Sequence, residues 1–281
     1  MVTKEIAYKW DSNNQKEEIL YPNGNKVNYT YNPIGNVTQV EKQRKDIPQD
    51  SGLFTYQYDK IGRLTSIANG NNVTSYTYDT LGNRLSTQDG NNPPTLYTYN
   101  ARNQLVKEEY SNNVIKTYQY DQRGNLTTTS QDGNITEQYT YNHANLLTKA
   151  TTPKGTAEYT YNGFKNRVGL KETLSIPTIP NPTKELSYIL DLTKPYDNLI
   201  QTNGTHNQAY IWGNELLSAN GDETYNYLQD HLGSPIRLVG SNTNNPLAYD
   251  VFGEQLQSMQ SINVTNNPFT FTGYQVDGVY N

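Results

Sequence analysis

A pair of aromatic side chains separated by one polar residue recurs along the first 170 residues of the chain. One clear copy is Tyr139-Thr140-Tyr141-Asn142, with Asn145 and Leu147 following it. Successive side chains of a β-strand point to opposite faces, so this spacing places both rings on one face and the polar residue on the other. Tyrosine and threonine both suit a pleated, half-buried surface. The pattern predicts strands with one aromatic face and one polar face.

A turn signal follows each aromatic pair. The next residue is Asp or Asn, whose side chain can accept a hydrogen bond from the backbone two residues further on. Three places later comes Gly or Asn, which tolerates the positive φ of a tight turn. Lys165 takes this place in one copy, and we expect that turn to differ. A second short strand then leads to signals such as Asn69-Gly70 and Asp89-Gly90, which are typical of hairpin turns. One repeat is therefore predicted to be one antiparallel hairpin.

The second aromatic residue advances from Trp10 by 21, 27, 20, 21, 21, 21 and 20 residues, and a fixed period of this kind indicates a repeat architecture. The 27-residue step holds a polar insertion near Lys42 to Gly52, which we expect to be an exposed loop. Weaker copies begin at Tyr8 and Tyr159. The structural residues of the six clear copies are Tyr29, Tyr31, Gly35, Tyr56, Tyr58, Asp59, Gly62, Tyr76, Tyr78, Asp79, Gly82, Tyr97, Tyr99, Asn103, Tyr118, Tyr120, Asp121, Gly124, Tyr139, Tyr141 and Asn145.

Eight copies with two strands each give about sixteen strands, and sheets of more than ~10 strands curl or split. The right-handed twist of strands also disfavours a flat ribbon of that width. The sequence predicts an all-β fold in which tandem antiparallel β-hairpins of ~21-residue period form a curved or closed wall. Residues 1–171 are the hairpin array and residues 172–185 a proline-rich loop. Strand-like runs return over residues 186–281, which we expect to continue the same wall.

Composition narrows the function classes. The chain is only 33% hydrophobic, but its 25 tyrosines in register are not typical of disorder. A net charge of −5 without basic blocks argues against nucleic acid as a partner. Cysteine is absent, and no apolar run approaches the ~20 residues of a membrane span. The first residues lack the apolar core of a signal peptide, so we expect the export signal outside this chain, whose N-terminus resembles a cut through a longer array.

Candidate chemistry is sparse. Asp230, His231 and Ser234 are too close in sequence to form a relay of strand residues, and a turn is the preferred interpretation. A carboxylate pair among Asp230, Asp250 and Asp277 is a minor alternative to three turn residues. The three histidines have no metal-ligand spacing, so no metal, cofactor or catalytic residue is predicted. The tyrosines are expected to pack as cross-strand pairs, with stacking on sugar rings as the alternative.

Three motifs close the chain: Asp230-His231-Leu232-Gly233-Ser234-Pro235, the run Tyr249 to Gly253, and the run Asn267 to Tyr274. With the aromatic array they resemble YD repeats of the rearrangement hotspot (RHS) type, followed by the start of an RHS-associated core. The motif residues of that core are Asp230, His231, Leu232, Gly233, Asp250, Gly253, Gly273 and Tyr274.

The resemblance implies a hollow shell of spiralling β-hairpins, similar to those of bacterial polymorphic toxins, toxin-complex components and teneurins. In bacterial members such a shell encloses a C-terminal toxin polypeptide, so the expected partners are a cargo polypeptide and further shell segments. The chain stops where the resemblance implies an arginine- and tyrosine-rich stretch and a self-cleavage site, so we expect a non-enzymatic shell fragment. We expect a secreted or cell-surface bacterial protein. The alternative is a cell-surface adhesion module that binds glycans or a surface protein through its tyrosines.

Overall fold

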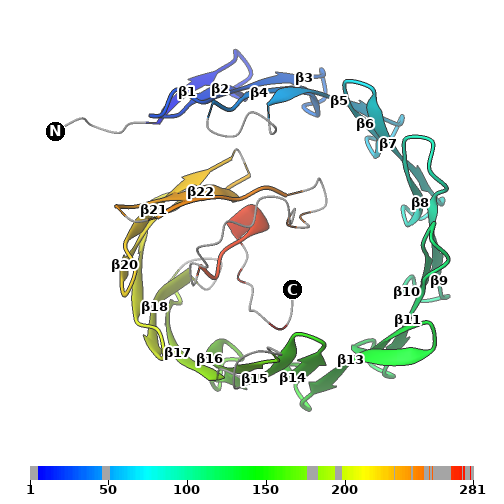
Figure 1. The fold of residues 1–281 in the computed structure, drawn as a ribbon, viewed down its shortest axis with the longest axis vertical. Helices are drawn as coiled ribbons and strands as arrows, with labels where there is room; N and C mark the ends of the chain where they lie inside the picture. Colours follow the sequence, from blue (N-terminus) through cyan, green and yellow to red (C-terminus); the bar gives the residue numbers. More distant parts are fainter. Residues whose placement is uncertain are drawn as a thin grey trace. The chain divides into compact units, whose positions relative to one another are not determined.

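The computed structural model describes residues 6–45, 51–175, 183–193, 198–230, 232–241, 243–249, 253, 255, 267–273, 275 and 279. The described residues form 23 strands, which are assigned to one antiparallel sheet. The only helical turn among the described residues is η3 (Phe271–Gly273). The all-β prediction is confirmed. The chain divides into unit 1, residues 1–118 with 131–133, and unit 2, residues 119–130 with 134–281 (Figure 1).

Unit 1 holds the N-terminal hairpins, in which each strand pairs with its neighbours in sequence. Its strands are β1 (Ala7–Trp10), β2 (Lys16–Leu20), β3 (Lys26–Tyr31), β4 (Val37–Gln43), β5 (Gly52–Tyr58), β6 (Leu64–Asn69), β7 (Asn72–Tyr78), β8 (Arg84–Asp89), β9 (Thr95–Tyr99), β10 (Leu105–Glu109) and most of β11 (Ile115–Tyr120).

Unit 2 continues the same sequential pairing from β13 onward. Its strands are β12 (Leu126–Gln131, apart from its last residue), β13 (Asn134–Tyr141), β14 (Leu147–Thr152), β15 (Gly155–Tyr161), β16 (Arg167–Leu174), β17 (Thr183–Asp191), β18 (Asn198–Gly204), β19 (Gln208–Trp212), β20 (Leu216–Gly221), β21 (Tyr225–Gln229), β22 (Pro235–Val239) and β23 (Asn244–Pro246). In Figure 1 these strands curve around the segment that contains η3.

Most hairpins of the array contain a register shift at the second aromatic residue. Gln57 faces Ser66 but the next residue, Tyr58, faces Leu64, so one residue of β6 has no partner across the ladder. The same shift occurs at Tyr31, Tyr78, Tyr141 and Tyr161. Such a β-bulge bends the strand and interrupts its ladder of hydrogen bonds. The bulge therefore frees backbone groups that must find partners elsewhere.

The turn after each bulge is closed by one side-chain oxygen. In the turn at Asn142, its Oδ1 accepts hydrogen bonds from the backbone N–H groups of Ala144 at 2.9 Å and Leu146 at 3.0 Å. The Asn142 N–H also donates to the Leu146 carbonyl at 3.0 Å. Asp59, Asp79 and Asp121 make the same pair of side-chain bonds. A short carboxylate or amide here satisfies two backbone donors that the turn would otherwise leave open.

The expectation that the Lys165 turn differs is wrong. Lys165 adopts φ 70°, and its N–H donates to the Asn162 carbonyl at 3.0 Å, as glycine does in other copies. Asn162 Oδ1 accepts from Phe164 and Asn166 in the usual way. The two side-chain bonds hold the turn strongly enough that a lysine is carried into the left-handed region, which costs of order 1 kcal/mol or more.

Two irregular segments depart from the predicted boundaries. Strand β16 extends to Leu174 and β17 begins at Thr183, so both ends of the expected proline-rich loop are strand, and residues 176–182 lie outside the described residues. The insertion after β4 was expected to be exposed, but Arg44 is only 5% exposed. Its N–H donates to Ser51 Oγ at 2.7 Å, which closes this loop. Residues 46–50 lie outside the described residues.

Replacing Asn142 tests the role of the turn oxygen. Asn142→Ala removes the acceptor for two backbone N–H groups and should lower the free energy of unfolding by about 1 kcal/mol. Asn142→Asp keeps Oδ1 and should lower it by much less at neutral pH. Urea denaturation of both variants measures the difference, and equal losses in the two variants would contradict this account.

Candidate functional site: the tyrosine face

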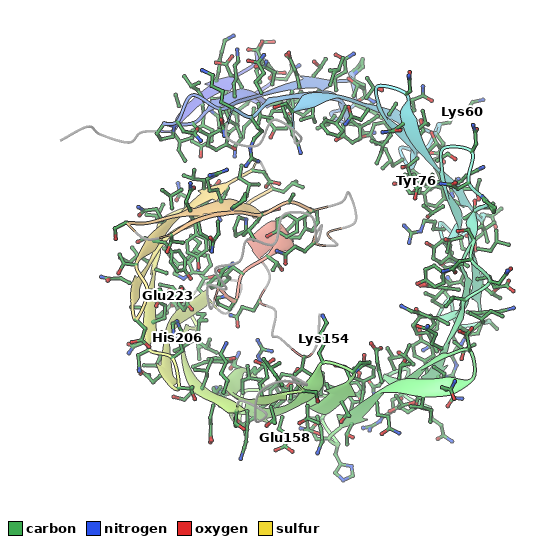
Figure 2. All side chains as sticks on the ribbon, viewed as in Figure 1. Lys60, Tyr76, Lys154, Glu158, His206 and Glu223 are labelled. Atoms are coloured by element: carbon green, nitrogen blue, oxygen red, sulfur yellow. The ribbon has the colours of Figure 1, made fainter. Side chains whose placement is uncertain are left out.

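The tyrosine face is the side of the sheet that carries the aromatic pairs. Tyr29 and Tyr76 in unit 1 and Tyr139 and Tyr159 in unit 2 are buried, whereas the residue between each pair is exposed. Figure 2 shows Tyr76 on the concave side of unit 1 and Lys60 on its convex side. Burial raises the pKa of Tyr56 to about 12, which keeps its phenol neutral at physiological pH. The face is therefore aromatic and uncharged at the rings.

The second tyrosine of five pairs bonds to the preceding repeat. Tyr58 Oη donates to the Val37 carbonyl at 2.7 Å, and Tyr78 Oη donates to the Leu64 carbonyl at 2.7 Å. The acceptor is each time the first residue of the preceding repeat's second strand, at the bulge. Equivalent bonds join Tyr31 to Lys16 at 2.8 Å, Tyr99 to Arg84 at 3.0 Å and Tyr161 to Leu147 at 2.7 Å. We call this bond the latch.

A tryptophan forms the same latch in unit 2. Trp212 Nε1 donates to the Leu199 carbonyl at 2.8 Å. Leu199 pairs with Leu190, where the register of the β17–β18 hairpin shifts. Tyr210 and Trp212 thus form a further copy of the aromatic pair, which the sequence motif did not include because its turn is shorter. The signal that identifies it is Trp10, which also replaces the second tyrosine of its copy.

The turns are joined to each other along the edge of the sheet. Asn83 Nδ2 donates to Asp79 Oδ2 at 2.8 Å within its own turn and to Asn103 Oδ1 at 3.1 Å in the next. Asn125 does the same with Asp121 and Asn145. The hydrogen bonds from these side-chain amides are the main reason why the pKa values of Asp79 and Asp121 lie below the usual range for aspartate. The edge of the array is therefore a chain of side-chain bonds that runs between consecutive repeats.

The C-terminal segment lies on the tyrosine face of unit 2. Phe269 is 1% exposed, and its ring meets Tyr210, Trp212 and Tyr227 edge to face, at centroid distances of 5.1, 5.5 and 6.0 Å. Tyr227 Oη donates to Asn267 Oδ1 at 2.9 Å. Edge-to-face contacts of this kind add about 0.5–1.5 kcal/mol each beyond area burial. The three rings form a cage for one aromatic side chain.

The same segment makes further contacts along this face. Val279 packs into a cluster with Tyr139 and Tyr159, and its carbonyl accepts a bond from Thr152 Oγ1 at 3.0 Å. Arg167 Nη2 donates to Gln275 Oε1 at 3.1 Å. Residues more than 100 positions apart in sequence are thus brought together, and the tyrosine face of unit 2 packs against residues near the end of the chain.

The three terminal motifs meet in the fold. Asp230 Oδ1 accepts from the N–H groups of Leu232 and Ser234, which forms the expected turn. Ser234 Oγ accepts from the Thr272 N–H at 3.0 Å. The Tyr249 and Phe271 rings lie 5.8 Å apart, and Gly253 abuts Phe271 so closely that a Cβ would lie 2.5 Å from its ring. His231, Asp250, Tyr274 and Asp277 lie outside the described residues.

No group of three histidine, aspartate or glutamate side chains within the described ranges is placed to hold a metal ion. His206 Nδ1 and Asp222 Oδ2 lie 3.4 Å apart, and no second carboxylate or histidine among the described residues joins them in such a group. Among the described parts of the chain no helix is long and apolar enough to cross a membrane.

The hairpin period, the bulge and the latch define a tandem β-hairpin repeat protein. A family profile described as the teneurin YD-shell matches residues 39–173. The repeat geometry and this match together make the chain an RHS/YD-repeat protein, with a segment of the YD-shell type. No curated protein matches the chain.

Several solved structures are similar to the chain at low identity. The TcdB2-TccC3 complex without its hypervariable C-terminal region gives a TM-score of 0.41 at 15% identity, over 88% of this chain and 16% of that chain. The TcdB2-TccC3 complex gives a TM-score of 0.42 at 17% identity, over 91% of this chain and 16% of that chain. A mutated Tc holotoxin pore from Photorhabdus luminescens gives a TM-score of 0.33 at 14% identity, over 98% of this chain and 19% of that chain. The chain spans about one sixth of the length of these chains.

Removing one phenol tests the latch. Tyr78→Phe leaves the Leu64 bulge carbonyl without its partner and should lower the free energy of unfolding by about 1 kcal/mol. Tyr56→Phe is the matched control, because the Tyr56 hydroxyl makes no hydrogen bond to any described residue. Denaturant unfolding measures the free energy of unfolding of both variants. Equal losses in the two variants would show that the latch does not stabilise the fold.

Acid should weaken the turns. The folded-state pKa values of Asp59, Asp79 and Asp121 lie below the ordinary value, so their ionised forms stabilise the fold above pH ~4 and that contribution is lost as the pH falls further. Changing all three to Asn, the residue of other copies, should flatten the dependence of the melting temperature on pH between about pH 5 and 2. A triple variant that loses stability in acid as steeply as the parent would refute this assignment.

Proposed function

We propose that the chain is a wall segment of a shell whose tyrosine face binds and encloses a cargo polypeptide. The observation that carries the proposal is the placement of Phe269 in the aromatic cage of unit 2 and of Val279 beside Tyr139 and Tyr159. Polypeptide is thus already the ligand of this face within the chain. The proposed role is structural, with no catalytic step and no cofactor.

The chemistry of the face suits a polypeptide of variable sequence. The hydroxyl of the second tyrosine is used in the latch, so the half-buried rings of residues such as Tyr58 and Tyr78 are left for apolar contact with a guest. Ring edges and faces accept many apolar and aromatic side chains, so contact with them does not require one particular sequence. The proposed partners are a cargo polypeptide and further YD segments. The proposed setting is outside the cell, secreted or at the surface of a bacterium, in keeping with the toxin complexes that the comparisons name.

The alternative is an adhesion module that stacks sugar rings on tyrosine. Its motivation is the pair Tyr8 and Trp10, whose rings are 40% and 49% exposed. The other aromatic pairs are partly or fully covered by neighbouring strands or, in unit 2, by the C-terminal segment. This distribution favours polypeptide enclosure over glycan binding along the array.

Photo-crosslinking in the native full-length protein tests the proposal. A photoreactive phenylalanine at Tyr56 lies on the tyrosine face, and the same group at the neighbouring Gln57 lies on the exposed face. We expect cross-links from position 56, and not from position 57, to polypeptide outside residues 1–281. Cross-links from both positions or from position 57 alone would overturn enclosure, as would a native reading frame that ends at Asn281. Binding of glycans in the micromolar range would support the adhesion module instead.

Phe269→Ala tests the cage itself. The variant empties a site that is fully buried, so we expect a loss of about 3–5 kcal/mol of stability and faster proteolysis of the C-terminal segment. Phe164→Ala is the matched control, because Phe164 is 84% exposed at a turn and should be near neutral. Urea denaturation with mass spectrometry of tryptic fragments gives both readouts. If Phe269→Ala leaves the cleavage rate of the segment unchanged, the cage does not hold it.

A further inference from the structure

One place on the tyrosine face is aliphatic in some hairpins and basic in others. It is the first residue of the second strand, which faces the second aromatic residue at the register shift and whose carbonyl accepts the latch. We call it the latch place. Valine or leucine takes it at Val37, Leu64, Leu105, Leu126 and Leu147, and a basic residue takes it at Lys16, Arg84 and Arg167. A half-buried place that suits leucine thus holds a cation in three hairpins.

The basic side chains at the latch place lie over aromatic rings. The guanidinium carbon of Arg84 is 4.5 Å from the centre of the Tyr97 ring. That of Arg167 is 5.5 Å from the centre of the Tyr159 ring, and the Lys16 ammonium stacks on its own repeat in the same way. All three lie within the ~6 Å over which a ring attracts a cation. Stacking occupies the flat face of a guanidinium and leaves its N–H donors for hydrogen bonds in its plane.

Arg167 shows what a stacked arginine does when polypeptide covers the face. Its Nη2 donates to Gln275 Oε1 at 3.1 Å, and Gln275 pairs with Phe269, the residue that fills the cage. The ligand of the stacked guanidinium is therefore a side-chain oxygen of the covering segment. Arg84 holds the same register position in unit 1, opposite the second tyrosine of its hairpin.

The tyrosine face of unit 1 carries further cations. The ammonium groups of Lys42 and Lys116 lie 5.0 and 5.5 Å from the centres of aromatic rings. The carboxylates of Glu108 and Asp89, on the same face, already accept hydrogen bonds from hydroxyl groups of the chain. A guest on this face therefore meets guanidinium and ammonium groups next to carboxylates that are already engaged.

We propose that Arg84 is a guest-binding residue, which binds the carboxylate of an aspartate or glutamate in the polypeptide that the tyrosine face of unit 1 encloses. The inference rests on the proposed enclosing role and adds the chemical class of the guest side chain. A carboxylate can accept two parallel bonds from the guanidinium fork, whereas Gln275 offers Arg167 one neutral oxygen. The preference concerns charge at a few places, so it remains compatible with guests of variable sequence.

Photo-crosslinking in the native full-length protein separates this inference from enclosure. A photoreactive phenylalanine at Tyr97 lies under Arg84, and one at Tyr56 probes a repeat preceded by Val37 at the latch place. Arg84→Leu should lower the yield of guest cross-links from position 97 at least fivefold and leave the yield from position 56 within twofold. The guest residues captured from position 97 in the parent should lie beside Asp or Glu.

Two features of the chain control this comparison. Leucine is the native residue at the latch place of other hairpins, so Arg84→Leu is compatible with the fold. Arg102→Leu removes the same charge from an exposed turn, where Leu81 stands in the preceding repeat. It should leave the cross-links from position 97 unchanged.

The 281-residue chain itself tests which oxygen a stacked arginine prefers. Gln275→Glu places a carboxylate against Arg167 and should raise the urea midpoint of unfolding at pH 7. The gain should disappear at pH 3, where the new carboxyl is protonated, and also in an Arg167→Leu background. A lower midpoint for Gln275→Glu in the presence of Arg167 would overturn the preference for acidic side chains.

The cross-linking outcomes distinguish the two proposals. Cross-links from position 97 that persist in Arg84→Leu, or that map to guest segments without Asp or Glu, would overturn the acidic guest and leave enclosure intact. An equal loss in Arg102→Leu would assign the effect to net charge and overturn the role of Arg84. Cross-links that map only within residues 1–281 would make a segment of the chain the occupant, and an absence of cross-links from both positions in the parent would remove enclosure and this inference together.

Discussion

The rest of the structure depends on one bond, the latch between the second aromatic residue of a repeat and the bulge carbonyl of the repeat before it. The bulge lets each hairpin bend and close its turn, but it leaves a carbonyl that the hairpin cannot satisfy by itself. A buried carbonyl without a donor costs about 1–3 kcal/mol. A repeat is therefore complete only when a neighbour is present, which explains both the fixed period and the choice of residue. Phenylalanine would fill the face without closing the latch, which accounts for tyrosine at the second place of the pair.

This constraint also explains how so polar a chain folds. The apolar contribution is confined to one side of the sheet, where the first tyrosine of a repeat faces Val40, Ala150 or Leu170 across the ladder. Along the turn edge the same coupling between neighbours is made by side chains such as Asn83 and Asn125. Cohesion is thus added repeat by repeat, as in other linear repeat proteins, rather than gathered into one central core.

Local rules allowed the hairpins to be predicted, because strand periodicity and turn chemistry act over a few residues. The turns at Asp59 and Asp121 follow from the preference of aspartate for backbone donors two and four residues away. The Lys165 turn was mispredicted because φ preference was weighed alone, without the two bonds to Asn162 that fix the backbone. The burial of Arg44 was not predicted, because the hydrogen bond from its N–H to Ser51 Oγ joins two residues of a polar insertion that carries no apolar signal.

The contacts of the candidate site lie beyond such rules. Nothing local to Thr152 or Tyr210 indicates that residues near the end of the chain will cover them, since the pairing partners are separated by many repeats that all carry the same motif. A repeated face offers many equivalent places, and only the geometry of the bends decides which one Phe269 reaches. The same degeneracy has a functional consequence under the proposed role. A face that repeats the same aromatic pair, with the hydroxyl of the second tyrosine used in the latch, would hold polypeptide by contact area and not by sequence. A wall of this kind remains compatible with its guest when the guest changes, which is the property that an enclosing shell requires.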